Sequence, residues 1–318
     1  MAANADFVNE AGGVRLDAAL FSHLPSSTMA FVREAIAAGR VHVDGRVLRK
    51  GARLRGGERI LARDVAEAAD NRVLPDAEIP AEPVYVDASL LAFDKPAGMP
   101  VHPLSRGETG TLANGVAARF PECAAVGDSP LAAGAIHRID ADTSGLVLFA
   151  RTPEAFASLR SQFAARAVLK RYLALVEGQV ESGATLENDL AHDPGVPFCR
   201  MIDAHRNRLC ESERRRLRAF HAETTFEPLE TVRFGQAEAT LLSVSIRTGV
   251  THQIRAQLAL AGIHIVNDTL YGAFAVEGCG RHFLHSLSAA FRHPETGAET
   301  EISVPPPDWA RRRQARCG

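Results

Sequence analysis

Residues 137–151 read HRIDADTSGLVLFAR and place a polar segment directly before an apolar run. The run LVLFA follows Gly145 without a break, which is typical of a strand that is buried on both faces. Asp140, Asp142, Ser144 and Gly145 also have the spacing of the first half of a calcium-binding loop. The stretch therefore predicts either a metal site or a loop that presents a carboxylate at the start of a core strand.

The calcium interpretation fails at the position that matters most. A calcium loop that starts at Asp140 requires a bidentate glutamate as its twelfth residue, and that residue is Arg151. The histidines and cysteines of the chain also lack the spacing of a zinc site. We therefore expect no metal. Asp140 is then either a polar residue that caps the strand or a catalytic carboxylate on a loop, flanked by His137 and Arg138.

The composition is that of a soluble globular protein. The chain has 318 residues, of which 46% are apolar and 23% charged, and it is long enough for two domains. It contains no apolar run long enough to span a membrane, and its first residues lack the regions of a secretory signal. Its five cysteines are scattered without CxxC spacing. We expect a cytoplasmic protein with free thiols and no membrane partner.

Residues 12–66 are predicted to form a small α+β domain. Apolar residues at helical spacing come first, and the strand pattern VHV at 41–43 is followed by the turn signal Asp44-Gly45. Residues 14–64 contain ten Lys or Arg and five Asp or Glu, so they carry +5 within a chain of net charge -2. One interpretation is a solvated surface. The other is an RNA-binding module whose candidate contacts are Arg33, Arg40, Arg46, Lys50 and Arg53.

The rest of the chain divides into a linker and a larger domain. Residues 67–82 are acidic, contain two prolines and show no periodicity, which is typical of a linker. Residues 83–318 mix strand-like runs, such as YLALV at 172–176, with helical segments, such as THQIRAQLALAG at 251–262. Because these do not alternate regularly, we expect a mixed, mostly antiparallel sheet with packed helices, and hence an α+β fold class.

Five segments of this larger domain resemble, in order, the motifs of the RluA-type pseudouridine synthases. DKPAGMPVH at 94–102 is similar to NKPAG-x-x-VH, and HRIDADTSG at 137–145 is similar to HRLD-x-[DE]-TSG. KRYLALVEG, RTGVTHQIRAQLALAGIHIVNDTLYG and LHSLSAAFRHPETG resemble the other three. Residues 14–64 resemble an S4 RNA-binding domain, so the resemblance covers nearly the whole chain.

The resemblance implies roles for particular residues. Asp140 matches the catalytic carboxylate, Arg255 the arginine that pairs with it, and Tyr172 the active-site tyrosine. Arg138 matches the residue that fills the gap left by a base flipped out of its stack. The histidines of these motifs are expected to be structural. The sequence departs from the motifs at Val250, where Arg or Lys is usual, at Gln257, where His is usual, and at Asn267, which replaces Gly.

The implied activity is the isomerisation of uridine to pseudouridine in RNA, without a cofactor. Asp140 either attacks C1′ as a nucleophile or removes the C2′ proton as a base, and both routes stay open. The expected partner is large-subunit ribosomal RNA of the 23S type or its precursor, with tRNA as the alternative, and the protein is expected to be a monomer. Two other classes are an RNA-binding regulator with an inactive catalytic domain and a metal hydrolase.

Overall fold

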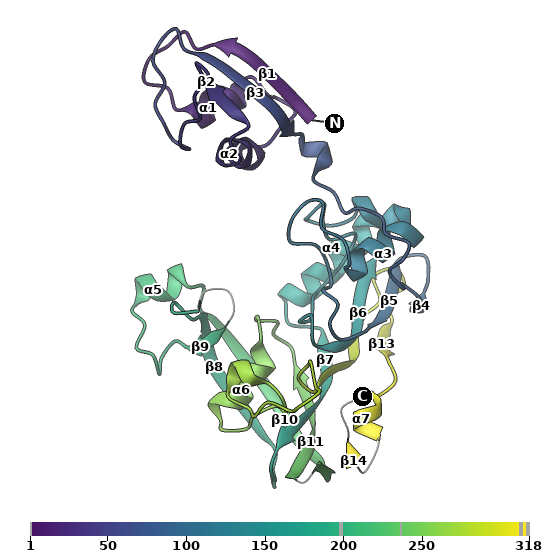
Figure 1. Ribbon diagram of the computed structural model, residues 1–318. Coiled ribbons are helices and arrows are strands. Elements are labelled where there is room, and N and C mark those ends of the chain that lie inside the picture. Colours follow the sequence, from purple (N-terminus) through teal and green to yellow (C-terminus); the bar gives the residue numbers. More distant parts are fainter. Residues whose placement is uncertain (1, 197–199, 236, 312–313, 316–318) are drawn as a thin grey trace. The chain divides into compact units, whose positions relative to one another are not determined.

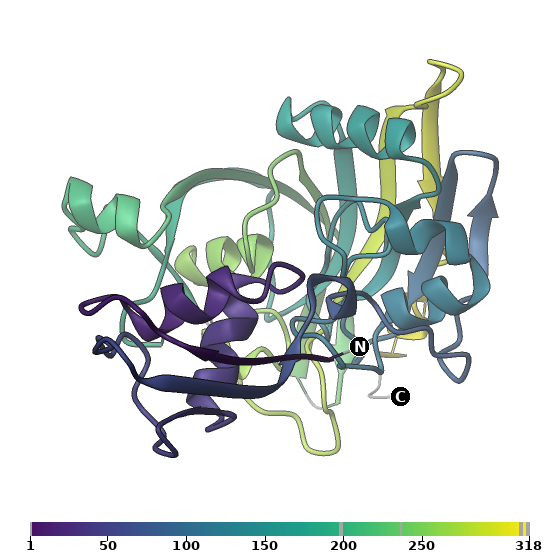
Figure 2. The same ribbon diagram turned by 90° about the horizontal axis from the view of Figure 1, so that it is seen from above.

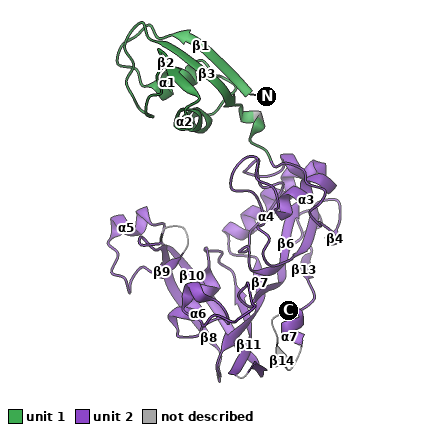
Figure 3. Ribbon diagram, viewed as in Figure 1, with its two compact units in different colours: residues 1–72 green, residues 73–318 purple. Residues whose placement is uncertain are grey.

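The computed structural model describes residues 2–196, 200–235, 237–311 and 314–315 (Figure 1). The chain divides into two compact units, residues 1–72 and 73–318 (Figure 3). Among the described residues, no helix is long and apolar enough to cross a membrane.

Unit 1 is a three-stranded antiparallel sheet with two helices packed on it. Its elements are β1 (Ala2–Val8), α1 (Leu16–Ser22), α2 (Met29–Ala37), β2 (Val41–Val43) and β3 (Arg59–Ala66), and the strand order is β1-β3-β2. The helices bury Leu16, Leu20, Val32 and Ile36 against the sheet. After β2 the backbone turns at Asp44 and Gly45, both with positive φ, as the turn signal predicts. Strand β1 lies before residue 12 and was not predicted.

The stretch between the expected domains is only partly a linker. A short 3₁₀ turn, η1 (Ala68–Asp70), follows β3. Val73 and Ala81, by contrast, are buried in the core of unit 2, and the Val73 amide donates to the Pro130 carbonyl at 2.9 Å. Residues 73–81 therefore pack as part of unit 2, which differs from the expectation for 67–82. Composition did not reveal this, because acidic and proline-rich residues surround the few apolar side chains that make the contact.

Unit 2 is built on a long mixed sheet. Its strand order is β4-β5-β6-β12-β7-β11-β10-β8-β9, with β13 paired to β12 and β14 to β10. All pairings are antiparallel except β6 with β12 and β10 with β14, which confirms the mixed, mostly antiparallel sheet. The strands are β4 (Pro83–Val86), β5 (Leu90–Lys95), β6 (Ser144–Ala150), β7 (Leu169–Glu177), β8 (Ala184–His192), β9 (Met201–Asp203), β10 (Phe220–Phe234), β11 (Ala237–Ile246), β12 (Leu284–Arg292), β13 (Glu299–Ser303) and β14 (Gln314–Ala315).

Helices cover parts of this sheet. Viewed as in Figure 2, the teal helices lie beside β5, β6 and the yellow strands, and α5 lies at the other end of the sheet. In α4, Phe156 and Leu159 pack into the core beside β6, and Thr152 caps the helix by accepting from the Ala155 amide. The helices and 3₁₀ turns are α3 (Leu112–Arg119), η2 (Pro121–Ala125), α4 (Pro153–Ala164), α5 (Glu211–Arg216), α6 (Gln253–Leu260), η3 (Thr269–Tyr271) and α7 (Asp308–Arg311).

The parallel pairing of β6 with β12 fixes the loop that carries Asp140. Ser144 pairs with His285 and Gly145 with Ser286, and the Ser144 hydroxyl is 2.9 Å from Nδ1 of His285. Gly145 has φ of +108°, and a Cβ at this position would lie 2.1 Å from the Ser286 carbonyl oxygen. The glycine of the quoted stretch is therefore required for the two strands to approach each other.

Among the described cysteines, one differs from the expectation of free thiols. Cys123 is a buried free thiol and Cys210 an exposed one. Burial raises the pKa of Cys123 to about 12, so its thiol stays protonated. Cys279 is disulfide-bonded, and the prediction of free thiols is wrong there. Cys199 and Cys317 lie outside the described residues.

Candidate active site

A cavity of about 200 Å³ opens where β7, β11 and α6 meet the loop before β6. This is smaller than the roughly 300–1,000 Å³ typical of sites for drug-sized ligands, and it suits a ligand of the size of one base. The lining is mixed, with apolar side chains such as Ile246 and Leu284 next to polar ones. All the residues that the sequence analysis places around the reacting uridine line this cavity, namely Arg138, Asp140, Tyr172 and Arg255.

Arg255 joins two carboxylates. Its NH1 donates to Oδ2 of Asp140 at 2.9 Å, while its Nε and NH2 donate to the two oxygens of Asp268 at 2.7 and 2.8 Å. Arg255 and Asp268 are buried, whereas the Asp140 side chain is 24% exposed. The bidentate pair with Asp268 fixes the guanidinium, and the guanidinium in turn fixes Asp140. Asp268 follows the IHIVN segment and was not singled out from the sequence.

His252 and Tyr271 form a second contact to the same carboxylate. His252 Nε2 lies 3.8 Å from Oδ2 of Asp140, and its Nδ1 lies 3.1 Å from the Tyr271 hydroxyl. That hydroxyl also accepts from the Met201 amide at 2.9 Å, which leaves its own proton for Nδ1. His252 then carries its proton on Nε2, facing Asp140. Arg255 and His252 therefore both address Oδ2, and no hydrogen bond or ion pair joins Oδ1 to a described residue.

The electrostatics keep Asp140 ionised. Burial raises the pKa of Asp140, but the charge interactions with His252 and Arg255, together with the hydrogen bond from Arg255, outweigh it, and the net pKa lies below the ordinary value. Burial lowers the pKa of His252, which is consistent with a neutral ring. Burial also opposes the charge on Arg255, yet its bonds to Asp268 and Asp140 raise its pKa further. The carboxylate is thus charged at neutral pH, as a nucleophile or base must be.

Lys95 stabilises the loop that carries Asp140. Its Nζ donates to the carbonyls of Pro96, Met99 and Ala141 at 2.7–2.8 Å, and its side chain is fully buried. Burial lowers the pKa of Lys95 to about 8. Because Ala141 directly follows Asp140, this ammonium group fixes the backbone at the catalytic position. The sequence analysis did not assign Lys95 a role.

Tyr172 and Lys170 contribute the side of the cavity formed by β7. Tyr172 is buried, and burial raises the pKa of its hydroxyl to about 12, so the phenol stays protonated. Burial lowers the pKa of Lys170 to about 8, and its Nζ donates to the Thr248 carbonyl at 2.7 Å. The register of β7 places both residues on one face, two positions apart.

The three departures from the family motifs have structural explanations of unequal weight. Gln257 is fully buried and bridges α6 to β8 and β10: Nε2 donates to the carbonyls of Leu186 and Ala222, and Oε1 accepts from the Thr224 hydroxyl. Asn267 adopts φ of +63°, a conformation that asparagine tolerates better than most residues. Val250 lines the cavity, and nothing in the structure explains its replacement of a cation.

Other side chains considered from the sequence have structural contacts. His137 accepts from the Leu148 amide, and burial lowers its pKa to about 3. His285 is held by Ser144. Within the described part of the chain, no group of three or more His, Cys, Asp or Glu side chains could hold a metal ion. Arg151, at the calcium-ligand position, instead donates to Glu122.

The predicted RNA contacts fall into two groups. Arg33, Arg40 and Arg53 make contacts inside unit 1, with Asp17, Glu34 and the Gly13 carbonyl respectively. Arg46 and Lys50 are exposed, as is Arg138 at the rim of the cavity in unit 2. The RNA-binding role of all six remains a prediction.

The fold is shared with solved pseudouridylate synthases. Human RNA pseudouridylate synthase domain containing 1 aligns over 73% of this chain and 86% of its own, with a TM-score of 0.58 and 23% sequence identity. Human RNA pseudouridylate synthase domain containing 4 aligns over 71% and 89%, with a TM-score of 0.52 and 18% identity. At these identities the likeness shows the fold.

Sequence comparison adds the family. Residues 89–260 match the RNA pseudouridylate synthase model and residues 14–60 the S4 domain model. Ribosomal large subunit pseudouridine synthase D of Xanthomonas campestris is 34% identical over 94% of this chain and 88% of its own length. The protein of the same name from Pseudomonas aeruginosa is 31% identical over 94% and 90%. The chain belongs to the RNA pseudouridylate synthase family and is an enzyme that acts on RNA.

Proposed function

We propose that the protein converts uridine to pseudouridine in large-subunit ribosomal RNA, with Asp140 as the catalytic carboxylate. The observation that carries the assignment of Asp140 is its position: it is ionised, partly exposed to a base-sized cavity, and held through Oδ2 alone. The ribosomal target is supported by the names of relatives that span nearly the whole chain.

The free Oδ1 is the atom that we assign to the reaction. As a nucleophile it would bond to C1′ while the bond from C1′ to N1 of uracil breaks. As a base it would take the C2′ proton while the same bond breaks. The detached uracil then turns and bonds to C1′ through C5. In the first route the bond from Oδ1 to C1′ breaks as this bond forms, and in the second Asp140 returns the proton to C2′. In both routes the C5 proton is then lost to a base, which restores the aromatic ring of the product.

The other residues support this exchange. Arg255 would keep Asp140 charged and oriented through its fixed pair with Asp268. The protonated Tyr172 phenol gives the free base a flat surface to turn on, and its hydroxyl can relay the C5 proton. Exposed Arg138 at the rim is suited to occupy the space that the flipped nucleotide leaves.

The decisive experiment is to map pseudouridine in total RNA from cells with and without the gene. We expect a ribosomal site that loses the modification and regains it with the wild-type gene but not with Asp140→Asn. A lost site in tRNA alone would overturn the ribosomal target. If no site changes, and no adduct forms with RNA that contains 5-fluorouridine, the protein is an RNA-binding regulator. We further expect the protein to be cytoplasmic. We also expect it to be a monomer, which sedimentation of the purified chain tests.

A further inference from the structure

The segment from Arg200 to His221 is a basic arm at the end of the sheet where β9 and α5 lie (Figure 1). Residues 200–218 contain seven Arg and three Asp or Glu, a net charge of +4. The whole chain carries -2, so this arm and the +5 of residues 14–64 leave -11 on everything else. The arm is therefore a positively charged segment on a unit whose remaining residues are acidic on balance.

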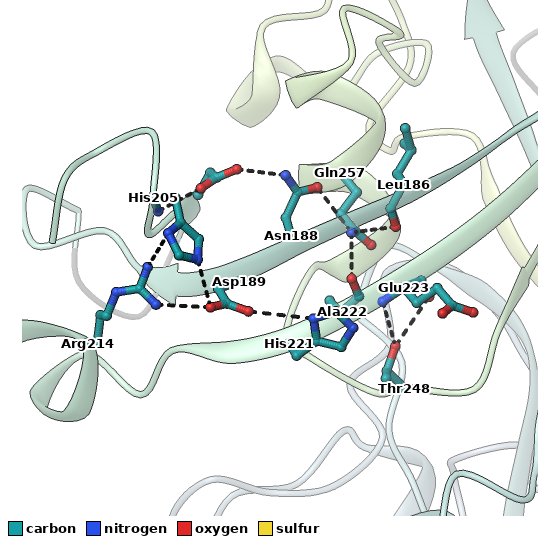
Figure 4. A network of polar contacts seen from close by, with 11 residues as sticks. Leu186, Asn188, Asp189, His205, Arg214, His221, Ala222, Glu223, Thr248 and Gln257 are labelled. Atoms are coloured by element: carbon teal, nitrogen blue, oxygen red, sulfur yellow. Dashed lines mark hydrogen bonds and ion pairs between the residues drawn. The ribbon is translucent and has the colours of Figure 1, made fainter. Parts of the chain in front are cut away.

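An internal network fixes the arm to β8 (Figure 4). Asp189 binds three side chains: Arg214 NH1 at 3.0 Å, His205 Nε2 at 3.1 Å and His221 Nδ1 at 3.6 Å. Arg214 NH2 also donates to His205 Nδ1 at 2.7 Å, so that nitrogen is unprotonated and the ring is neutral. The network thus pairs the charge of Arg214 with that of Asp189 and leaves the other arginines of the arm outside it.

The neighbouring arginines remain available to a partner. Arg208, Arg216 and Arg218 are exposed, and their guanidinium groups donate no hydrogen bond to the described residues. Arg215 has a single 3.4 Å contact with Glu211, and both side chains are about four-fifths exposed. An exposed pair of this kind contributes little stability, so it would yield easily to a phosphate.

An aromatic side chain stands at the base of the arm. Phe220 is 56% exposed and begins β10, two residues after Arg218. On the same strand, Ala222 is fully buried against α6. A half-exposed aromatic ring beside free arginines is the combination with which proteins bind single-stranded RNA, because bases stack on the ring and phosphates pair with the cations.

The arm is also tied to the catalytic helix. The Met201 amide donates to Tyr271, which holds His252, and Arg206 NH1 donates to the Leu260 carbonyl at the end of α6 at 2.9 Å. Asn188 connects Gln257 of α6 with Asp203 of β9. The arm therefore has a fixed position relative to Arg255, as a surface that guides a substrate into the cavity requires.

We propose that the basic arm binds single-stranded RNA next to the target nucleotide, with phosphates on Arg208, Arg215, Arg216 and Arg218 and a base on Phe220. The proposal rests on RNA being the substrate and not on which RNA is modified.

The first test replaces charge. Binding of a labelled oligouridylate to the full-length protein is measured by fluorescence anisotropy between about 50 and 200 mM salt. The triple variant Arg215→Gln, Arg216→Gln, Arg218→Gln keeps residues that favour helices. We expect the slope of log K against log salt to fall by about 2, since each lost phosphate contact contributes about 0.7. The matched control, with the same loss of charge near α4, is Arg160→Gln, Arg166→Gln, Arg292→Gln.

The second test replaces the ring. Phe220→Ala should weaken oligouridylate binding by about fivefold or more, and Phe220→Trp should restore it, since stacking tolerates any flat ring. Leu229→Ala is the control, because Leu229 lies on the same strand and is 55% exposed. An unchanged salt slope in the arm variant, an equal loss in either control, or wild-type binding by Phe220→Ala would overturn the proposal. None of these outcomes depends on the modified site.

Discussion

Each unit contains a cluster of three charged side chains, and the signs of the charges are reversed between the two clusters. In unit 2, one arginine, Arg255, serves two aspartates, and the cluster carries one negative charge in excess. In unit 1, one aspartate, Asp17, serves two arginines and the excess is positive: Arg15 Nε and NH2 and Arg33 Nε all donate to Asp17 at 2.9–3.0 Å.

The difference shows how each unit presents its surplus charge. Asp17 is 2% exposed and its arginines 50% and 48%, so the carboxylate is the fixed centre and the cations face solvent. Around Arg255 the arginine is the fixed centre and the partly exposed carboxylate is the surplus. The first arrangement suits binding of an anion. The second suits chemistry by an anion.

The largest expected effect comes from removing the shared cation. Arg255→Gln should lower the single-turnover rate of pseudouridine formation by about 100-fold, because it leaves Asp140 and Asp268 without their buried partner. The loss should be at least that of Tyr172→Phe. Burial then dominates, so the pKa of Asp140 rises and the acidic limb of the rate profile moves to higher pH. Release of tritium from C5-labelled uridine measures the rate. Full activity at neutral pH would show that another cation holds Asp140.

Deletion of unit 1, whose ion cluster has an excess of positive charge, should weaken RNA binding and leave the chemical step largely unchanged. Deleting residues 1–72 should raise the Kd for RNA at least about tenfold and change the rate at saturation little, because the lost contacts stabilise ground and transition states alike. Loss of three or four phosphate contacts should reduce the salt slope by roughly 2 to 4. The cut falls before Val73, which the core of unit 2 requires. A fall in the saturated rate with an unchanged slope would make unit 1 a structural support.

Asp268→Asn sharpens the comparison within unit 2. The guanidinium loses its fixed orientation, and we expect the rate to fall about tenfold, less than for Arg255→Gln. The charge of Arg255 is then available to Asp140 alone, so the pKa of Asp140 stays low and the acidic limb does not move upward. Single-turnover rates from pH 4 to 8 distinguish the two variants, which lose activity for different reasons. Matching pH profiles would contradict this division of roles.

The smallest effect is expected for the cluster of unit 1. Asp17→Asn should lower the free energy of unfolding by about 1–2 kcal/mol. The effect is this small because both arginines are half exposed and solvent screens their charges. Its arginine bonds hold the pKa of Asp17 well below its ordinary value of 3.8 despite burial. The stabilisation is therefore present above pH 4 and is lost as pH falls through the folded-state pKa.

The chain offers an internal control for this measurement. Trp309 is the only tryptophan and lies in unit 2, so its fluorescence follows unit 2, while far-UV circular dichroism follows both units. The variant should shift the dichroism transition and leave the fluorescence transition in place. Asp6→Asn breaks an exposed pair with Arg59 and should shift neither by more than about 0.5 kcal/mol.

The sequence reveals what repeats locally and misses what depends on distant contacts. Apolar runs predicted β6 and β7, and the family motifs predicted that Asp140, Tyr172 and Arg255 share one site, which the cavity confirms. Asp268 was missed because a buried partner of an arginine looks like any loop aspartate. Lys95 was missed because its three acceptors are backbone carbonyls, which leave no side-chain signal.

The extents of the two units also depend on contacts between distant segments. Strand β1 pairs with β3 more than fifty residues later, and its short pattern AANADFV has no strong alternation. Residues 73–81 reach the core of unit 2 through isolated side chains. In both cases the partner segment decides the structure, and the partner is not adjacent in the chain.

Because β6 pairs with β12, which comes much later in the chain, this part of the sheet cannot form until β12 has been translated. Ser144 meets His285 only after 141 further residues have been made, an interval of about 7–28 s at 5–20 residues per second. Until then the edge of β6 that pairs with β12 is unpaired, and the loop with Asp140 lacks the strand contact that fixes its end. The same holds for Arg255 and Asp268, which are themselves translated late. The residues of the cavity around Asp140 can therefore come together only after β12 has been made, long after unit 1 has left the ribosome.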